Sequence, residues 1–125
     1  MQEKIQQEQE TMKENRQGEA VFPDGPPQNA IENWKQEFGD IYMTEFDSDT
    51  FIWRALSRME YKEIMNGEQL GEWESEEKVV SMCTLWPENY TSEDMTRGKA
   101  GIPSTLFDQI MAKSGFVAQG TARKL

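Results

Sequence analysis

Residues 41–54 read IYMTEFDSDTFIWR, and this stretch decides how the rest of the chain has to fold. Side chains in residues 41–46 alternate between two faces, and β-branched and aromatic residues dominate, which favours a strand. Residues 47–50 have the composition of a turn, and residues 51–54 form a second apolar run. The stretch therefore predicts a β-hairpin over a four-residue loop. Because a lone hairpin is only marginally stable in water, it must pack against helices.

The segments on either side of the hairpin predict two helices. Before it, an apolar stripe made by Ile31, Trp34 and Phe38 predicts a helix that is capped by Asn29 and stopped by Gly39. After it, Ser57 and Glu60 have the spacing of a capping box, in which each side chain binds a free backbone amide of the other residue. A stripe follows this box, made of Tyr61, Ile64 and Met65, and Gly67 ends the helix.

Two further helices are predicted in the second half of the chain. The first is capped by Ser75, is apolar on most sides through Trp86, and stops at Pro87, so we expect it to be the central helix. Thr91 or Ser92 could start a single helical turn. The last helix has Pro103 at its first position, and residues 114–116 have the pattern of a Schellman ending. Its apolar stripe consists of Leu106, Phe107, Ile110 and Met111.

Residues 1–28 differ in composition from the remainder. Up to residue 16 they are rich in Gln, Glu and Lys, with too few apolar side chains to offset the entropy of ordering, so we expect a fraying helix or a disordered segment. Residues 18–28 have linker composition, and Phe22 within them either pins the loop to the domain or docks a partner. The predicted fold is a small α+β domain over residues 29–118, with about four helices and one hairpin. Residues 119–125 form a short basic tail.

Charge and composition exclude several classes of function. The 125 residues contain 13 basic and 23 acidic side chains, for a formal net charge of −10. Phosphate backbones and anionic membrane surfaces repel such a chain, so neither nucleic acid nor a membrane is an expected partner. The sequence has no histidine and one cysteine, which excludes histidine-based catalytic triads and imidazole zinc sites. No internal disulfide is possible, which suits a reducing compartment.

Carboxylates are the only abundant acid–base groups, and the pairs Glu60–Glu63 and Glu72–Glu76 could in principle flank a glycosidic bond. They lie on predicted solvated faces, caps and linkers, where charge is ordinary. Cys83 falls within the most apolar helix, which predicts a buried, inert thiol. We therefore expect no catalytic residues, no cofactor and no metal.

Aromatic and acidic residues provide the candidates for partner binding. Trp34, Phe38, Phe51, Trp53, Phe107 and Phe116 fall on amphipathic faces and are expected in the core. Trp73 stands among glutamates, either as a lid or as an interface anchor, since Trp is enriched among binding hot spots. The acidic turn at residues 47–50 and the acidic segment 68–77 flank the hairpin and Trp73, a surface that suits a basic partner segment. The candidate contact residues are Phe22, Asp47, Asp49, Trp73, Glu74, Trp86 and Tyr90.

Six short segments follow one another in a recognisable order: residues 34–39 (WKQEFG), 51–54 (FIWR), 57–64 (SRMEYKEI), 83–87 (CTLWP), 99–103 (KAGIP) and 110–116 (IMAKSGF). In this order they resemble small proteins of large contractile-tailed bacteriophages that act as tail assembly chaperones or baseplate-hub assembly proteins. The resemblance covers residues 30–117.

The resemblance implies a non-enzymatic protein that binds another tail protein, such as the tape measure or the baseplate hub, during morphogenesis. It would act in the host cytoplasm, or in the virion if it stays in the particle. The alternative from the structural class is a permanent baseplate component. Two remoter alternatives are a small carboxylate-dependent cell-wall hydrolase and an acidic mimic of DNA.

Overall fold

The computed structural model of the chain describes residues 18–67, 71–116 and 122–125. The expected disorder or helix before residue 18, and the expected domain end at residue 118, lie outside these ranges. The chain divides into two units, one up to Gly39 and one from Asp40 onward, and each is described by itself. The sequence had placed the division at residue 28 and so grouped the helix before Gly39 with the larger unit.

Within residues 18–39, the first unit shows a tight loop followed by helix α2 (Gln28–Phe38). Ala20 forms a bridge with Pro27, and the Val21 amide donates to the Pro26 carbonyl over 3.0 Å. Phe22 is half-buried within this loop, and its ring lies so close over Gly25 that a Cβ there would be 2.5 Å away. Only glycine therefore fits at residue 25 without displacing the ring.

Helix α2 spans Gln28–Phe38 and starts two residues earlier than the cap predicted at Asn29 would allow. Pro27 is the residue before the first turn, where the amide that proline lacks would have no helical partner. The predicted stop at Gly39 is confirmed, with a φ of 82° that favours glycine. The structure describes every residue of α2, and none of them is buried. The prediction that Trp34 and Phe38 are core residues is therefore wrong.

The second unit contains a three-stranded antiparallel sheet in the order β1 (Ile41–Glu45), β2 (Thr50–Arg54), β3 (Thr84–Trp86). The predicted hairpin is confirmed: Tyr42 lies opposite Trp53, and the Phe46 amide donates to the Asp49 carbonyl over 2.7 Å.

Strand β3 corrects the prediction that the central helix continues to Trp86. That helix ends at Cys83, and Thr84 is extended and lies opposite Trp53 of β2. Two physical reasons favour this ending. A residue that precedes proline, as Trp86 does, is pushed toward extended backbone. The backbone groups on the far edge of β2 also need partners, which β3 supplies.

The helices of the second unit are α3 (Arg58–Asn66), α4 (Glu72–Cys83), α5 (Ser92–Arg97) and α6 (Gly101–Lys113). With α2, the described ranges contain five helices and three strands, which confirms the α+β class. The capping box of α3 is confirmed, with both Ser57–Glu60 hydrogen bonds at 3.1 Å. Thr91 caps α5 through a similar box with Asp94, so the single turn predicted there is a real helix.

Two further predicted helix starts, those of α4 and α6, are wrong by a few residues. Helix α4 is preceded by Gly71, and the Ser75 amide already donates to the Gly71 carbonyl, so Ser75 lies inside the helix. Glutamates in the first turn of α4 complement the helix dipole, which extends the helix toward its N-terminus. Helix α6 starts at Gly101, and Pro103 occupies its third position, where an amide would still lack a helical partner.

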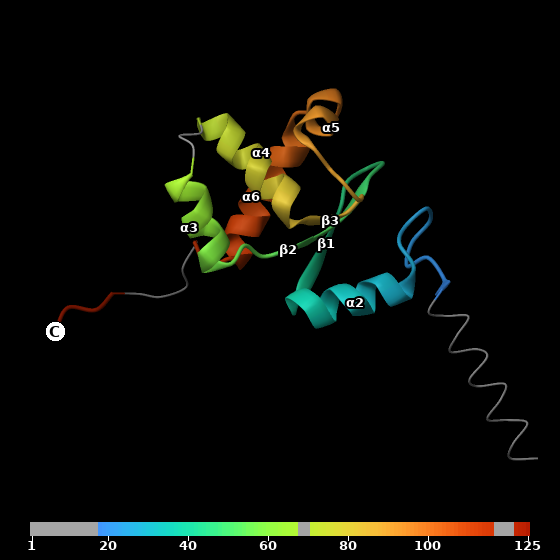
Figure 1. Cartoon of the computed structure of the whole chain (residues 1–125), viewed down its shortest axis with the longest axis horizontal. Coiled ribbons are helices and arrows are strands. Elements are labelled where there is room, and N and C mark those ends of the chain that lie inside the picture. The colour runs from blue at the N-terminus through green and yellow to red at the C-terminus, as the bar shows by residue number, and fades with distance from the viewer. Residues whose placement is uncertain (1–17, 68–70, 117–121) are drawn as a thin grey trace, which may run out of the picture. The chain divides into compact units, whose positions relative to one another are not determined.

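The core lies between one face of the sheet and the helices, with α4 and α6 packed against each other (Figure 1). Phe51 and Trp53 of β2 belong to one buried cluster with residues of α3, α4, α5 and α6, and α4 packs against both α5 and α6. The buried residues contributed by α4 and α6 are Val79, Val80, Cys83, Ile102, Leu106 and Ile110.

Two residues expected in or facing the core are instead on the surface. Met65 at the end of α3 is exposed. Phe116 follows the Schellman ending of α6, is 42 % exposed, and packs its ring 4.5 Å from that of Tyr61. Its contact is therefore with α3, at the margin of the fold.

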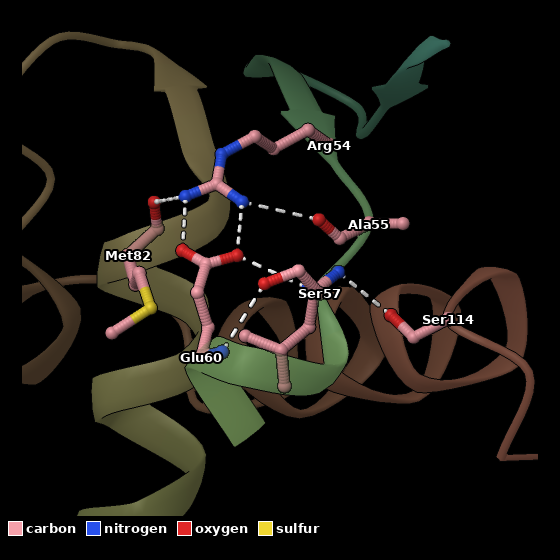
Figure 2. Close-up of polar contacts among 7 residues, drawn as sticks. Arg54, Ala55, Ser57, Glu60, Met82 and Ser114 are labelled. Atoms are coloured by element: carbon pink, nitrogen blue, oxygen red, sulfur yellow. Dashed lines mark hydrogen bonds and ion pairs between the residues drawn. The ribbon is translucent and has the colours of Figure 1, made fainter. Parts of the chain in front are cut away.

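A polar joint ties β2 to three helices (Figure 2). Arg54 forms a two-pronged ion pair with Glu60 of α3, each N–O distance being 2.8 Å, and donates over 3.3 Å to the Met82 carbonyl of α4. The Leu56 amide donates to the Ser114 hydroxyl just beyond α6 over 2.8 Å. These hydrogen bonds tie the chain that leaves β2 to α3, to α4 and to the end of α6.

Among the described residues, the helices are too short or too polar for any of them to cross a lipid bilayer.

Candidate functional site

Trp73 is the most prominent apolar side chain near an acidic surface. It lies in the first turn of α4, and 65 % of it is exposed. Trp73 precedes Val80 by seven residues and therefore shares nearly the same helical face. Val80 is fully buried, so the apolar face of α4 leaves the core at the N-terminal end of the helix. Trp73 stands where that face reaches solvent.

Two clefts lie on either side of Trp73. The smaller one, of about 260 Å³, separates α4 from α5 and the start of α6. Its lining residues are Trp73, Glu76, Glu77, Met95, Thr96, Gly98, Ala100 and Pro103. The larger and more open one, of about 690 Å³, lies between α4 and α6. It is lined by Glu72, Trp73, Ser75, Glu76, Ser104, Phe107 and Asp108. Trp73 and Glu76 line both clefts, so they form a ridge between them. We call this region the Trp73 surface.

The Trp73 surface is electronegative. Four carboxylates line its two clefts, and within the described ranges no Lys or Arg does. These carboxylates are Glu72, Glu76, Glu77 and Asp108. Glu76 accepts a hydrogen bond from Ser104 over 3.3 Å, which fixes its carboxylate near the ridge. Arg97, on neighbouring α5, is engaged with Glu93.

The other predicted contact residues do not join this surface. Asp47 and Asp49 are exposed in the β1–β2 turn, which Figure 1 shows well away from the first turn of α4. The surface predicted from two acidic segments around Trp73 is therefore split into separate places. Trp86 is half-buried in β3, opposite Ile52. Phe22 belongs to the other unit.

Tyr90 lies in the core. Its ring packs edge-on against Phe51 at 5.0 Å, and burial raises the pKa of its hydroxyl, with smaller contributions from the charges of Asp94 and Asp49. Glu74, by contrast, is exposed in the first turn of α4 next to Trp73, and its carboxylate lies against Gly71. Of the seven predicted residues, only Trp73 lines the two clefts, and Glu74 is beside it only as its neighbour in sequence.

Several residues of the Trp73 surface were not predicted as contacts, among them Met95, Pro103, Phe107 and Asp108. Met95 stands alone in a polar run, and Pro103 carries only a helix-start signal. Their place beside Trp73 depends on how α5 and α6 pack against α4, which no local pattern encodes. The sequence held one signal for the position of this surface: Trp73 lies seven residues before Val80 and so falls on the same face of the helix.

Glu60 and Cys83, two of the groups considered as catalytic candidates, lie outside the Trp73 surface. The hydrogen bonds from Arg54 lower the pKa of Glu60 to about 2, although partial burial opposes this. Glu60 is therefore ionised at neutral pH, whereas a general acid needs a raised pKa. Cys83 is fully buried, as predicted, and desolvation raises its pKa to about 11. In the described parts of the chain, no three His, Cys, Asp or Glu side chains are grouped closely enough to hold a metal.

Comparison of the chain with protein families, with curated proteins and with solved structures finds no match.

Proposed function

We propose that this chain is a non-enzymatic binding protein that holds another protein at the Trp73 surface. In the setting that the sequence resemblance implies, the partner is a bacteriophage tail protein, the tape measure or the baseplate hub. Binding would take place in the host cytoplasm while the tail is assembled.

The observation that carries this proposal is the exposed Trp73 ridge between two clefts. Leaving a large aromatic ring in water forgoes the free energy of burying it, which amounts to a few kcal/mol for a large apolar side chain. Tryptophan is also among the residue types enriched at the hot spots of protein interfaces, where it fills a well-packed position. A partner that covers Trp73 and fills both clefts would recover that free energy.

A capture experiment tests the proposal. The tagged full chain is co-expressed with the tape-measure and hub proteins of its phage, and retained tail proteins are identified by mass spectrometry. We expect one of them to be retained by the wild type and to fall about tenfold or more with Trp73→Ala, because an interface tryptophan commonly contributes at least ~2 kcal/mol.

The matched control is Met59→Ala. Met59 is also a large exposed apolar side chain, but it lies on α3, away from the Trp73 surface. Its removal should leave capture unchanged. Equal capture by Trp73→Ala and the wild type would refute the proposed binding surface.

Mass spectrometry of purified particles separates an assembly factor from a permanent baseplate part. As an assembly factor, the chain should be absent from mature particles or far below stoichiometry. Stoichiometric presence would replace the chaperone role with a structural one.

A further inference from the structure

We infer that the partner presents a cationic, amphipathic segment to the Trp73 surface, with one apolar side chain in the smaller cleft and Lys or Arg beside the carboxylates. The inference rests on the proposed function, because it assumes that the Trp73 surface is a binding site. It adds the chemistry of what is bound.

The smaller cleft suits a single side chain. Its volume of about 260 Å³ lies below the ~300–1,000 Å³ of pockets that enclose small ligands. Its walls combine the Trp73 ring, Met95 and Pro103, which offer apolar contact, and Met95 is itself buried. The thioether of methionine adapts to differently shaped apolar groups. An aliphatic or aromatic side chain from a partner therefore fits this cleft best.

The negative charge around that cleft determines which other side chains the partner must present beside its apolar one. Glu76 and Glu77 line the smaller cleft, and Glu72, Glu76 and Asp108 line the larger one. Covering these carboxylates with neutral or acidic groups would leave them desolvated and unpaired, at a cost. Lysine or arginine side chains at the rim would pair with them and remain partly hydrated. The larger cleft is open enough for such long side chains.

A second copy of this chain is a poor occupant of the same surface. The chain carries a net charge of −10, and a symmetric dimer would bring the same carboxylates face to face. Like charges placed opposite each other across an interface are costly. The electrostatics thus favour a different, basic partner.

Two designed peptides test this inference on the full chain. In the first, leucine and lysine follow a helical repeat, and in the second glutamate replaces every lysine. Affinity is measured by fluorescence anisotropy of the labelled peptide at low and at physiological salt. We expect the lysine peptide to bind, to weaken as salt rises, and to weaken further with Trp73→Ala, and we expect the glutamate peptide not to bind.

A pair of charge variants separates a specific site from general attraction to an acidic protein. Glu72→Gln with Asp108→Asn removes two exposed charges from the larger cleft, and should weaken binding of the lysine peptide by about two- to fivefold for each charge. Glu45→Gln with Glu63→Gln removes two exposed charges from β1 and α3, and should leave the affinity nearly unchanged. Equal weakening by both double variants, or binding of the glutamate peptide, would overturn the inference.

The same variants distinguish this inference from the proposed function. If tail-protein capture is lost with Trp73→Ala but persists with Glu72→Gln and Asp108→Asn, the binding function stands and the cationic partner is wrong. If capture persists with Trp73→Ala, the proposed function itself fails.

Discussion

Arg54 and Glu60 form the best-defined polar contact in the second unit. Their side chains are only 12 % and 25 % exposed, and both guanidinium nitrogens that reach the carboxylate do so at 2.8 Å (Figure 2). A partly buried ion pair contributes little compared with an apolar pair of the same shape. Removing one partner is nevertheless costly, because the other charge stays buried without compensation.

We predict that Glu60→Gln lowers the free energy of unfolding by about 1–3 kcal/mol at neutral pH. The pKa of Glu60 is about 2 in the folded chain, below the ~4.3 of an unfolded glutamate. The ion pair therefore stabilises the fold fully above pH ~4.5, and this stabilisation is lost as the pH falls toward 2. The difference between wild type and variant should shrink over that window, as measured by urea unfolding.

Glu63→Gln on the same helix is the control for this prediction. It removes the same charge from an exposed side chain, so its effect on the free energy of unfolding should stay within about 0.5 kcal/mol. A Glu60→Gln defect of the same size at pH 6 and pH 3 would mean that the ion pair does not set the pKa of Glu60.

At the scale of elements, the end of α6 shows how one glycine sets the path of the chain. The Phe116 amide donates to the Met111 carbonyl over 3.1 Å, and the Gly115 amide donates to the Ala112 carbonyl over 3.2 Å. These two bonds are the Schellman pattern that the sequence predicted. They require Gly115 at a φ of 90°, a region that strains other residues.

Two glycine substitutions, one in the first turn of α6 and one just beyond its end, should have opposite effects on stability. A Cβ meets open space at both Gly101 and Gly115, so the two sites differ mainly in backbone conformation. Gly115→Ala should destabilise the fold by about 1 kcal/mol or more, because alanine is strained at this φ. Gly101→Ala, in the first turn, should be neutral or stabilise by up to ~1 kcal/mol. Thermal and urea unfolding measure both, and the same sign for the two variants would contradict the assigned conformations.

The sequence predicts an element well where the residues that define its ends lie within a few positions of one another. The box at Ser57 and Glu60, the stop at Gly39 and the turn at residues 47–50 each act through neighbouring side chains and backbone groups. The starts of α4 and α6 could not be predicted because the residues before them, Gly71 and Ala100, have no capping side chain. In α4, favourable first-turn glutamates extended the helix past the better cap at Ser75.

At the scale of the molecule, Cys83 reports on the integrity of the whole second unit. It is fully buried where β2, α4 and α6 meet, and its pKa is raised to about 11 by desolvation. At pH 8 its thiolate is therefore hundreds of times scarcer than that of a free cysteine with a pKa of ~8.5. We predict that Cys83 reacts with a disulfide reagent at least about a hundredfold more slowly in the native protein than in urea.

A Cys83→Ser variant that also carries Ser92→Cys provides the comparison. Ser92 is exposed at the start of α5, so a thiol there should react at nearly the unfolded rate under native conditions. Rapid native reaction of Cys83 in the wild type would show that the core opens locally around α4.

The sequence by itself determined the α+β class, the hairpin, both ends of α3 and the stops of α2 and α6, because periodicity, caps and turns act between residues close together in the chain. It also identified Trp73 as a candidate anchor. The tertiary structure alone decided that Thr84–Trp86 form a strand, since their ladder pairing depends on β2, which lies about thirty residues earlier in the chain. It likewise decided that Tyr90 is core and that α5 and α6 build the clefts beside Trp73. These outcomes depend on packing between segments distant in sequence, where shape and burial outweigh local preference.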